Sequence, residues 1–276
     1  MVKSSLSMLT LRPKRSATRS RFRPASVRYA APALDKGLDI LELFASEPTG
    51  LTTSEAARRL GRTVGEIFRM LVCLEERGYI SQAASEEHYE LTLKLFELAH
   101  RHQPLHRFAA EARPLMENVA HDIGQSCHLA MLSNGEVIVV EQVDAPRTAG
   151  FALKLGARID LLNTASGHLI LAFQQSAIRD RSLAEWERRT RQQLPRGLDR
   201  HLARIRRRGY EEMPSYQVRG VTNIAFPVLN QRGDAIAALS VPFLARIGDR
   251  IGPADVKAVL LDASRKLSNA VGGQRP

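Results

Sequence analysis

The sequence predicts an α+β protein with two domains: a winged helix-turn-helix near the N-terminus and a larger domain built on an antiparallel sheet. The chain has 276 residues, 44% of them hydrophobic, which is enough for two packed cores. Two capped helices, a tight turn between them and a hairpin pattern occur in order within residues 33–92. Beyond them, β-rich runs alternate with helical runs and end in a hairpin, as is typical of α+β folds.

Residues 1–32 are predicted to form a disordered basic arm. Residues 1–34 hold eight basic groups and no acid, and the arm is rich in Arg, Ser and Pro without an apolar period. Such an arm can add phosphate contacts, or it can be a dispensable extension or the product of a start codon placed too far upstream. Residues 35–100 carry seven basic and twelve acidic groups, so the net charge of +11 does not by itself locate a nucleic-acid site.

The composition also bounds location and cofactors. No apolar run reaches the roughly 18 to 20 residues of a membrane span and no signal peptide is evident, so we expect a cytoplasmic protein without membrane contact. Cys73 and Cys127 lie in apolar periodic stretches, and we expect both to be reduced core thiols. His100, His102 and His106 cluster without a neighbouring carboxylate, so no metal site and no cofactor are predicted.

Three helices are expected first. Leu34, Leu38 and Leu41 have the spacing of one helical face, which ends before Pro48. Thr52-Thr53-Ser54-Glu55 is a capping box that opens a second helix, with Gly61 as its stop signal. Thr63-Val64-Gly65-Glu66 repeats the box and opens a third helix that closes at Gly78. The inward residues of this third helix are expected to be Val64, Ile67, Leu71 and Leu74.

A wing and a linker follow. Tyr79–Gln82 and His88–Leu91 are short alternating segments that predict a hairpin packed against the third helix, which completes a winged helix-turn-helix over residues 33–92. Residues 93–106 are predicted to be a helical linker. Residues 107–272 then form the second domain, whose first helix is expected to run to about Asp122.

The elements expected in the second domain are both helical and extended. Asn134-Gly135 is a strong hairpin turn, because these residues accept positive φ. Strands are predicted at 127–132, 137–143, 151–155, 221–229 and 235–241. Helices are predicted from Thr164 to about Gln175, at 178–192, at 198–208 and after Pro253.

The third helix is the candidate reader of duplex DNA, because the outward N-terminal side chains of such a helix reach base edges in the major groove. Arg69 could bond guanine or grip a phosphate, and Glu66 could accept from cytosine or serve its own cap. The residues predicted to contact DNA are Thr53, Arg58, Arg59, Arg62, Thr63, Gly65, Glu66 and Arg69. The alternative is a solvated basic face on an ordinary three-helix bundle.

No catalytic residues are predicted. The sequence has no nucleophile elbow, zinc-protease, Walker or dinucleotide-binding motif. Ser166-Gly167-His168 places a hydroxyl and an imidazole near a helix N-terminus, where free amides attract anions. A hydrolase would also need an acid partner and an oxyanion hole, and the sequence identifies neither, so anion binding is the better interpretation of this turn.

Several segments together resemble the IclR family of bacterial transcriptional regulators, over about 240 residues from Ala33 to about Ala270. In the first domain these are Ala33-Leu34-Asp35 through Asp39-Ile40-Leu41, Leu60-Gly61 through Arg69-Met70-Leu71, and Glu76-Arg77-Gly78-Tyr79-Ile80. In the second they are Leu155-Gly156-Ala157-Arg158, Thr164-Ala165-Ser166-Gly167, Gly209-Tyr210, Gly220-Val221 and Ala237-Ala238-Leu239-Ser240-Val241. Their order and spacing make the match specific.

The resemblance implies a winged-helix DNA reader joined by a helical linker to a GAF-like α+β effector-binding and oligomerisation domain. It further implies a homodimer or dimer of dimers on near-palindromic double-stranded operators, responsive to a small organic acid or aromatic effector. The effector-binding positions that it implies are Ser166, Gly167, His168, Met213, Asn223 and Ser240. Amides near Gly167, with the Asn223 amide and the Ser240 hydroxyl, suit a carboxylate in an apolar cavity, although Asn223 and Ser240 could equally be satisfied within a sheet.

This chain departs from the family pattern in three places. Gly65 and Glu66 stand where many members have a small hydroxyl residue, so base contacts can differ. Glu86 and Glu87 occupy the wing tip, where they would repel phosphates. Met213 and Asn223 replace an acid and a cysteine of some relatives, so effector identity does not transfer.

Two other functions stay open at this point. One is a small-molecule-binding enzyme or carrier with a purely structural N-terminal bundle, and the other is a general nucleic-acid-coating protein that uses the basic arm.

Overall fold

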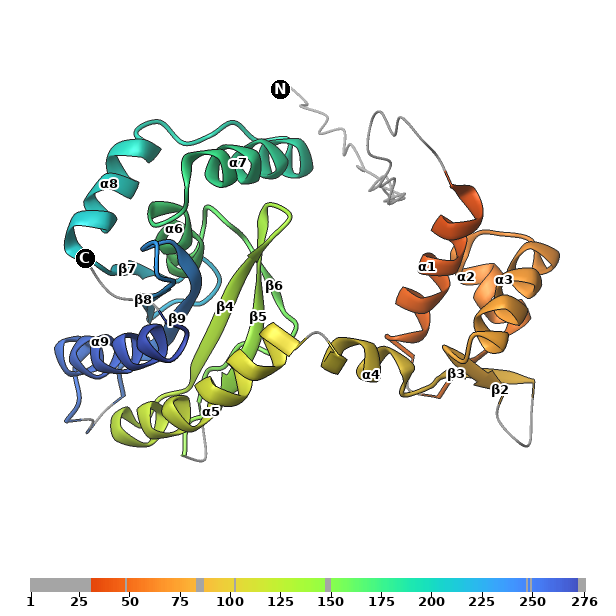
Figure 1. Ribbon diagram of the computed structural model, residues 1–276, viewed down its shortest axis with the longest axis horizontal. Coiled ribbons are helices and arrows are strands. Elements are labelled where there is room, and N and C mark those ends of the chain that lie inside the picture. The colour runs from red at the N-terminus through yellow and green to blue at the C-terminus, as the bar shows by residue number, and fades with distance from the viewer. Residues whose placement is uncertain are drawn as a thin grey trace, which may run out of the picture. The chain divides into compact units, whose positions relative to one another are not determined.

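The computed structural model describes residues 31–47, 49–82, 87–101, 103–146, 150–246, 248 and 250–272. The chain divides between Glu97 and Leu98 into two compact units (Figure 1). The predicted basic arm, apart from its last two positions, lies outside the described residues, as do Glu86 of the predicted wing tip and the side chains of the predicted linker histidines.

The first unit is a three-helix bundle with a small sheet. Its helices are α1 (Pro32–Phe44), α2 (Thr53–Leu60) and α3 (Val64–Glu76). Its strands are β1 (Leu51–Thr52), β2 (Ile80–Gln82) and β3 (His88–Leu91), paired antiparallel in the order β1-β3-β2. Ile40, Ile67 and Leu71 are fully buried where the helices meet. The predicted winged helix-turn-helix is confirmed.

Both predicted capping boxes are present. The Thr52 hydroxyl accepts from the Glu55 amide at 3.2 Å, while the Glu55 carboxylate accepts from the Thr52 amide at 3.0 Å. Thr63 and Glu66 make the same pair of bonds at 3.3 and 3.1 Å at the start of α3. Gly61 ends α2 at φ 64°, a left-handed conformation that glycine adopts without steric cost. The tight turn between α2 and α3 is therefore fixed by local sequence.

Two expectations for this unit are wrong. Val64 is 51% exposed rather than inward, because burial on α3 begins only at Ile67. Cys73 is exposed and not a core thiol. It stands two positions after Leu71, so at about 100° per residue it lies on the far side of the helix from the core. The two-residue strand β1, which extends the wing hairpin, was not anticipated.

The second unit is built on a six-stranded antiparallel sheet in the order β6-β5-β4-β9-β8-β7. Its strands are β4 (Cys127–Ser133), β5 (Glu136–Val143), β6 (Arg158–Ile159), β7 (Glu211–Pro214), β8 (Val221–Leu229) and β9 (Ala235–Leu244). Its helices are α5 (Gln103–Ile123), α6 (Ala165–Ala172), α7 (Ser176–Thr190), α8 (Leu198–Arg208) and α9 (Pro253–Ala270), while α4 (Lys94–Arg101) spans the division between the units. The predicted α+β class is confirmed.

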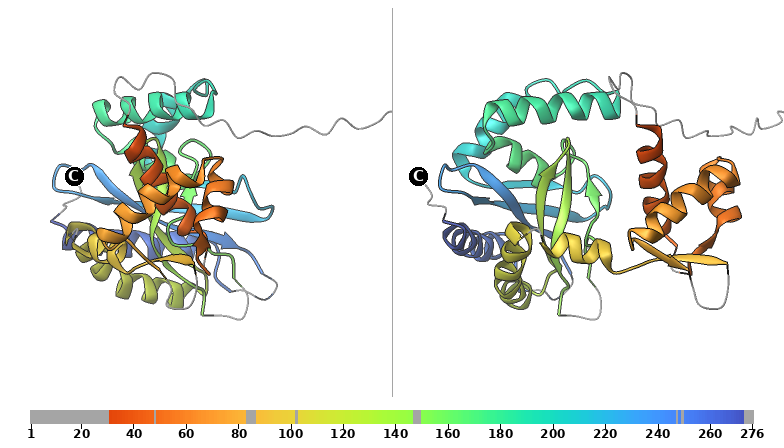
Figure 2. Two further views of the ribbon diagram at one scale, coloured as in Figure 1. Left: turned by 90° about the vertical axis from the view of Figure 1, so that its right-hand side faces the viewer. Right: turned by 45° about the vertical axis from the view of Figure 1, so that its right-hand side comes forward.

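Helices cover both faces of this sheet, as Figures 1 and 2 show. Alternate side chains of a strand point to opposite faces, so β8 serves two cores. Ile224, Phe226 and Val228 pack with α5 and α9 on one face. Ala225 packs with α6 and α8 on the other face, where Trp186 of α7 also lies. None of the helices within the described residues has the length and apolar character needed to cross a membrane.

Three expectations for the second unit need correction. Residues 151–155 form no strand. Instead the chain turns at Gly156, and β6 pairs with β5 through Arg158 and Ile159. Helix α6 ends at Ala172 rather than near Gln175. The edge strand β7 was missed, because a run beginning Glu211-Glu212 does not show the apolar alternation of a typical strand.

Candidate functional site

The N-terminal half of α3 presents an exposed and partly apolar face. Val64, Gly65, Phe68 and Arg69 are all exposed there, with Phe68 51% accessible. Thr63 caps the helix, so its hydroxyl is hydrogen-bonded within the protein. The structure therefore brings Thr63, Gly65 and Arg69 to one end of α3. Sequence reasoning missed Phe68, although its place next to the inward Ile67 and the outward Arg69 gave a signal.

Glu66 is occupied by contacts within the protein. One carboxylate oxygen accepts from the Thr63 amide at 3.1 Å, and the other accepts from the Lys36 ammonium at 2.6 Å. The hydrogen bond from Lys36, followed by the bonds from Thr63, lowers the pKa of Glu66 to about 2. Of the two roles considered for Glu66, the structure shows the capping role.

The predicted arginines differ in their surroundings. Arg59, in the last turn of α2, pairs with Glu47, and Arg62 pairs with Asp39 at 2.9 Å. Arg58 and Arg69 are exposed, and Arg69 has no ion pair within the described part of the chain. Arg69 is thus a cation available to an outside anion without first breaking an ion pair. Thr53, the first residue of α2, is half-buried.

A cavity that opens to solvent lies in the second unit at the start of α6. Its apolar walls include Phe151, Leu153 and Ile159. Its polar lining residues come from β4, β8, β9, the start of α6 and the segment after β7. These are His128, Thr164, Ser166, Ser215, Tyr216, Gln217, Asn223 and Ser240. Among the predicted effector residues, Ser166, Asn223 and Ser240 line the cavity.

His128 is the lining residue that sequence reasoning missed. It is 3% exposed, and neither ring nitrogen has a hydrogen-bond partner in the part of the chain that the structure describes. Burial lowers the pKa of His128 to about 4, so the ring is neutral at physiological pH and carries one donor and one acceptor. Because an unsatisfied buried polar group costs free energy, this imidazole is prepared for a polar ligand.

The start of α6 contributes a hydroxyl and backbone amides. The Ser166 and Ser240 hydroxyl oxygens lie 2.8 Å apart, and one donates to the other. The Gly167 amide donates to the Thr164 hydroxyl at 3.2 Å, so it is not the free amide that the sequence predicted. The first two amides of the helix, those of Ala165 and Ser166, have no acceptor within the helix, and both residues line the cavity.

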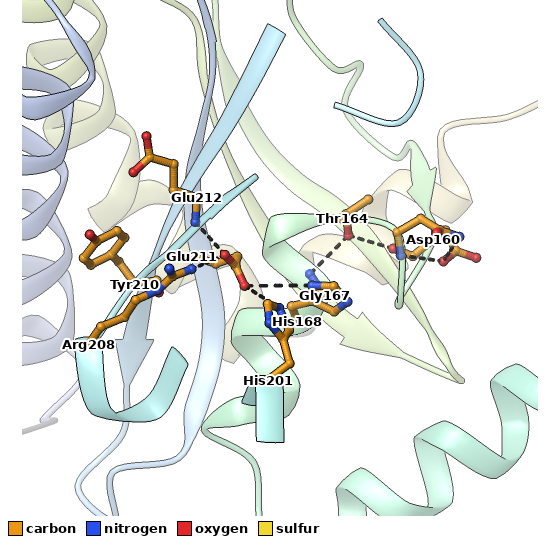
Figure 3. A network of polar contacts seen from close by, with 10 residues as sticks. Asp160, Thr164, Gly167, His168, His201, Arg208, Tyr210, Glu211 and Glu212 are labelled. Atoms are coloured by element: carbon orange, nitrogen blue, oxygen red, sulfur yellow. Dashed lines mark hydrogen bonds and ion pairs between the residues drawn. The ribbon is translucent and has the colours of Figure 1, made fainter. Parts of the chain in front are cut away.

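Gly167, His168 and Met213 lie outside the cavity lining. A Cβ on Gly167 would stand 2.1 Å from the Leu161 carbonyl oxygen, so a glycine is needed there for close packing. His168 points toward Glu211 and His201, as Figure 3 shows. Met213 packs against the core between α6 and the sheet. The structure therefore does not bring these three predicted positions to the cavity.

Comparison with known proteins agrees with this arrangement. The model of the IclR helix-turn-helix domain matches residues 33–84, and the model described as bacterial transcriptional regulator IclR C-terminal matches residues 103–269. The chain is 26% identical over 244 residues to the HTH-type transcriptional regulator XynR of Escherichia coli K12. This match covers 87% of this chain and 97% of XynR.

Solved structures give the same result. An IclR homolog from Microbacterium hydrocarbonoxydans complexed with 4-hydroxybenzoate superposes with a TM-score of 0.71 at 25% identity, covering 87% of this chain and 98% of the other. HmgR of Pseudomonas aeruginosa gives a TM-score of 0.68 at 26% identity, covering 88% and 100%. The chain therefore belongs to the IclR family of transcriptional regulators, which join a helix-turn-helix DNA-binding domain to a C-terminal effector-binding domain.

Proposed function

We propose that this regulator senses a small aromatic or other organic acid in the cavity of its second unit, and that occupancy changes its affinity for operator DNA. The observation that carries the proposal is the buried, neutral and unpartnered imidazole of His128 on the lining of a largely apolar cavity. The complex of a 25% identical relative with 4-hydroxybenzoate supports an aromatic acid as the class of effector.

The chemistry of the cavity fits such an acid. Phe151, Leu153 and Ile159 supply an apolar wall against which a ring or aliphatic body packs. The amides at the start of α6 and the positive end of its dipole favour a carboxylate. His128 can donate to a carboxylate or accept from a hydroxyl, and the Asn223 amide offers a further donor.

The DNA contacts are proposed on the exposed end of α3. Arg69 has the reach and the planar donor set for guanine or a phosphate, while Arg58 and Arg59 on α2 are placed to hold flanking phosphates. Arg59 and Arg62 would exchange their carboxylate partners for phosphates, which costs little because exposed ion pairs are worth about 0–1 kcal/mol. Glu66 keeps its cap and is proposed to orient the helix start rather than read a base.

We also propose a homodimer or dimer of dimers in the cytoplasm. Leu34 and Leu38 of α1 and Leu93 beside α4 expose large apolar surface, which is usual where another chain binds. A two-fold assembly then requires operator half-sites separated by whole helical turns. Effector binding alters operator affinity only if the two dimer arrangements bind the effector with different affinities.

The proposed role is binding rather than catalysis. The Ser166 hydroxyl is bonded to Ser240, whereas His168 two residues on faces Glu211. Positions i and i+2 lie about 200° apart around a helix, so this hydroxyl and imidazole cannot form a nucleophile–base pair.

The test is fluorescence anisotropy with labelled DNA from upstream of the chain's own gene, in the presence and absence of 4-hydroxybenzoate. We expect salt-sensitive, sequence-selective binding that changes with the acid but not with 4-hydroxybenzyl alcohol, which lacks the carboxylate. Arg69→Ala should weaken binding by about 1–3 kcal/mol, or roughly 5- to 150-fold, while Arg77→Ala at the other end of α3 should not. If Arg69→Ala and Arg77→Ala bind the DNA equally well, Arg69 is not the proposed DNA contact. If the acid and the alcohol change DNA binding equally, the effector is not recognised through a carboxylate.

A further inference from the structure

We propose that His168, His201 and Glu211 form a binding site for one divalent transition-metal ion, with Zn²⁺ as the favoured occupant. The three residues come from α6, α8 and β7, and their potential ligand atoms all lie within 4.8 Å of one another (Figure 3). None of the three residues lines the effector cavity, so the site is separate from the effector-binding function.

The distances suit a shared ion. His201 Nε2 lies 2.8 Å, and His168 Nδ1 3.9 Å, from Glu211 Oε2. Ligand atoms of a tetrahedral Zn²⁺ with bonds of about 2.0–2.1 Å lie roughly 3.3 Å apart, so the two measured separations fall on either side of that value. The two imidazole nitrogens lie within 4.8 Å of each other, so side-chain movements of roughly 1 to 1.5 Å would complete the geometry.

The buried atoms of this cluster lack hydrogen-bond partners. Glu211 is 1% exposed, and among the described residues neither its Oε2 nor the His168 Nδ1 has a hydrogen-bond partner. The close contact of Glu211 Oε2 with His201 is an ion pair only. Desolvation by burial, followed by the charge of His201, lowers the pKa of His168 and favours the neutral imidazole that a metal requires. An unsatisfied carboxylate oxygen facing two imidazole nitrogens is accounted for by an ion between them.

The rest of the cluster orients the ligands. Glu211 Oε1 accepts from the Arg208 guanidinium and, at 2.8 Å, from the Glu212 amide, which leaves Oε2 turned toward the two histidines. The imidazole of His168 also hydrogen-bonds the Leu162 backbone. Carboxylates and imidazoles that ligate metals are held in this way by further hydrogen bonds.

The set of ligands selects the ion. Two imidazole nitrogens and one carboxylate oxygen are favoured by Zn²⁺ and its neighbours over Mg²⁺ or Ca²⁺, which prefer oxygen. The His201 side chain is 35% exposed, so the ion can enter from the surface beside α8 and keep water as a fourth ligand. The bound ion would tie α8 and β7 to α6.

The test uses the full-length protein stripped with a chelator and titrated with Co²⁺, followed by Zn²⁺ competition against a chromophoric chelator. We expect one equivalent per chain with the visible absorption of four-coordinate Co²⁺, and a rise in melting temperature with Zn²⁺. His201→Ala is chosen because His201 is partly exposed. Loss of a residue that only hydrogen-bonds a metal ligand lowers affinity by roughly 10- to 100-fold, so loss of His201 as a ligand should weaken Zn²⁺ binding by more than that. His121→Ala, an exposed histidine on α5, is the matched control and should bind as the parent chain does.

Two results would overturn the proposed metal site. One is stoichiometric Zn²⁺ binding that His201→Ala leaves unchanged, and the other is no Zn²⁺ binding by the folded parent chain. In either case the cluster is a buried ion pair of Glu211 with Arg208 and His201. Glu211→Gln, which keeps the side-chain shape, provides a second variant: it should also weaken Zn²⁺ binding while its circular dichroism stays that of the parent. Operator binding is not part of the readout, so failure here leaves the proposed regulator untouched.

Discussion

The hydroxyl oxygens of Ser166 and Ser240 lie 2.8 Å apart, and this buried bond joins the first turn of α6 to the central strand β9 at the cavity. Ser240 is also the cross-strand partner of His128, so helix, strand and imidazole meet at one polar spot. An effector that hydrogen-bonds there acts on the helix and the sheet together. An effector bound there would therefore contact α6 and β9 at the same time.

Replacing Ser166 with Ala should weaken binding of the acid effector by about 5- to 10-fold, because the change removes a hydroxyl worth about 1 kcal/mol and leaves Ser240 short of a partner. Isothermal titration calorimetry with 4-hydroxybenzoate measures the effect. Ser182→Ala is the matched control, since Ser182 is also buried but bonds the Ile178 carbonyl in its own helix, away from the cavity. Equal affinities of the two variants would contradict the assignment of Ser166.

Two glycine substitutions should change stability in opposite directions. Gly167→Ala places a Cβ 2.1 Å from the Leu161 carbonyl oxygen and should cost about 2 kcal/mol or more of unfolding free energy. Gly65→Ala on α3 meets no atom within 4 Å and should add up to about 1 kcal/mol, because alanine favours a helix. Urea unfolding of both variants tests this pair, and a loss of stability in Gly65→Ala would contradict it.

Acid should destabilise the second unit through His128. Its pKa is about 4 in the folded chain, well below the ordinary value near 6.5. As pH falls from about 6.5 to 4, the unfolded chain takes up a proton that the folded chain does not, so unfolding becomes easier by up to roughly 3 kcal/mol.

His128→Gln cannot titrate and should remove that part of the acid slope in urea-unfolding free energies measured across this range. His121→Gln on the exposed face of α5 is the control and should keep the parent slope. A parent chain and His128→Gln with the same slope would show that His128 is not buried as a neutral ring.

Charged substitutions on α1 and beside α4 should weaken self-association. Leu34 and Leu93 are 62% and 74% exposed, and a glutamate at either position would have to be buried unpaired in the proposed interface. Sedimentation velocity should therefore show Leu34→Glu and Leu93→Glu dissociating at concentrations where the parent chain is associated. Leu155→Glu alters a leucine of similar exposure, 64%, in the second unit and should associate normally.

The features that were predicted best from the sequence are those that depend on residues close together in the chain. The capping boxes at Thr52 and Thr63 and the Asn134-Gly135 turn are local signals, and each formed as expected. The site depends on distant residues. His128 is buried because β4 pairs with β9, which lies more than 100 residues later in the sequence. No pattern in the residues around His128 predicts that pairing.

The errors have the same origin. Residues 151–155 have strand propensity, but in the fold Phe151 and Leu153 line the cavity and form no strand. Glu211 looks like a surface residue in the sequence, yet it is buried beside Arg208 and His201 of α8 and His168 of α6. The close approach of the Leu161 backbone to Gly167 is likewise visible only in the fold, and it gives the glycine a packing reason that the sequence did not reveal.

The half-exposed ring of Phe68 next to Arg69 has a consequence for operator sequence. A phenyl ring carried into the major groove finds its apolar partner in the 5-methyl group of thymine, which uracil lacks. Operators of this regulator should therefore contain a thymine beside the base or phosphate that Arg69 holds. Uracil at that one position, with every Watson–Crick pair preserved, should weaken binding for the parent chain and much less for Phe68→Ala.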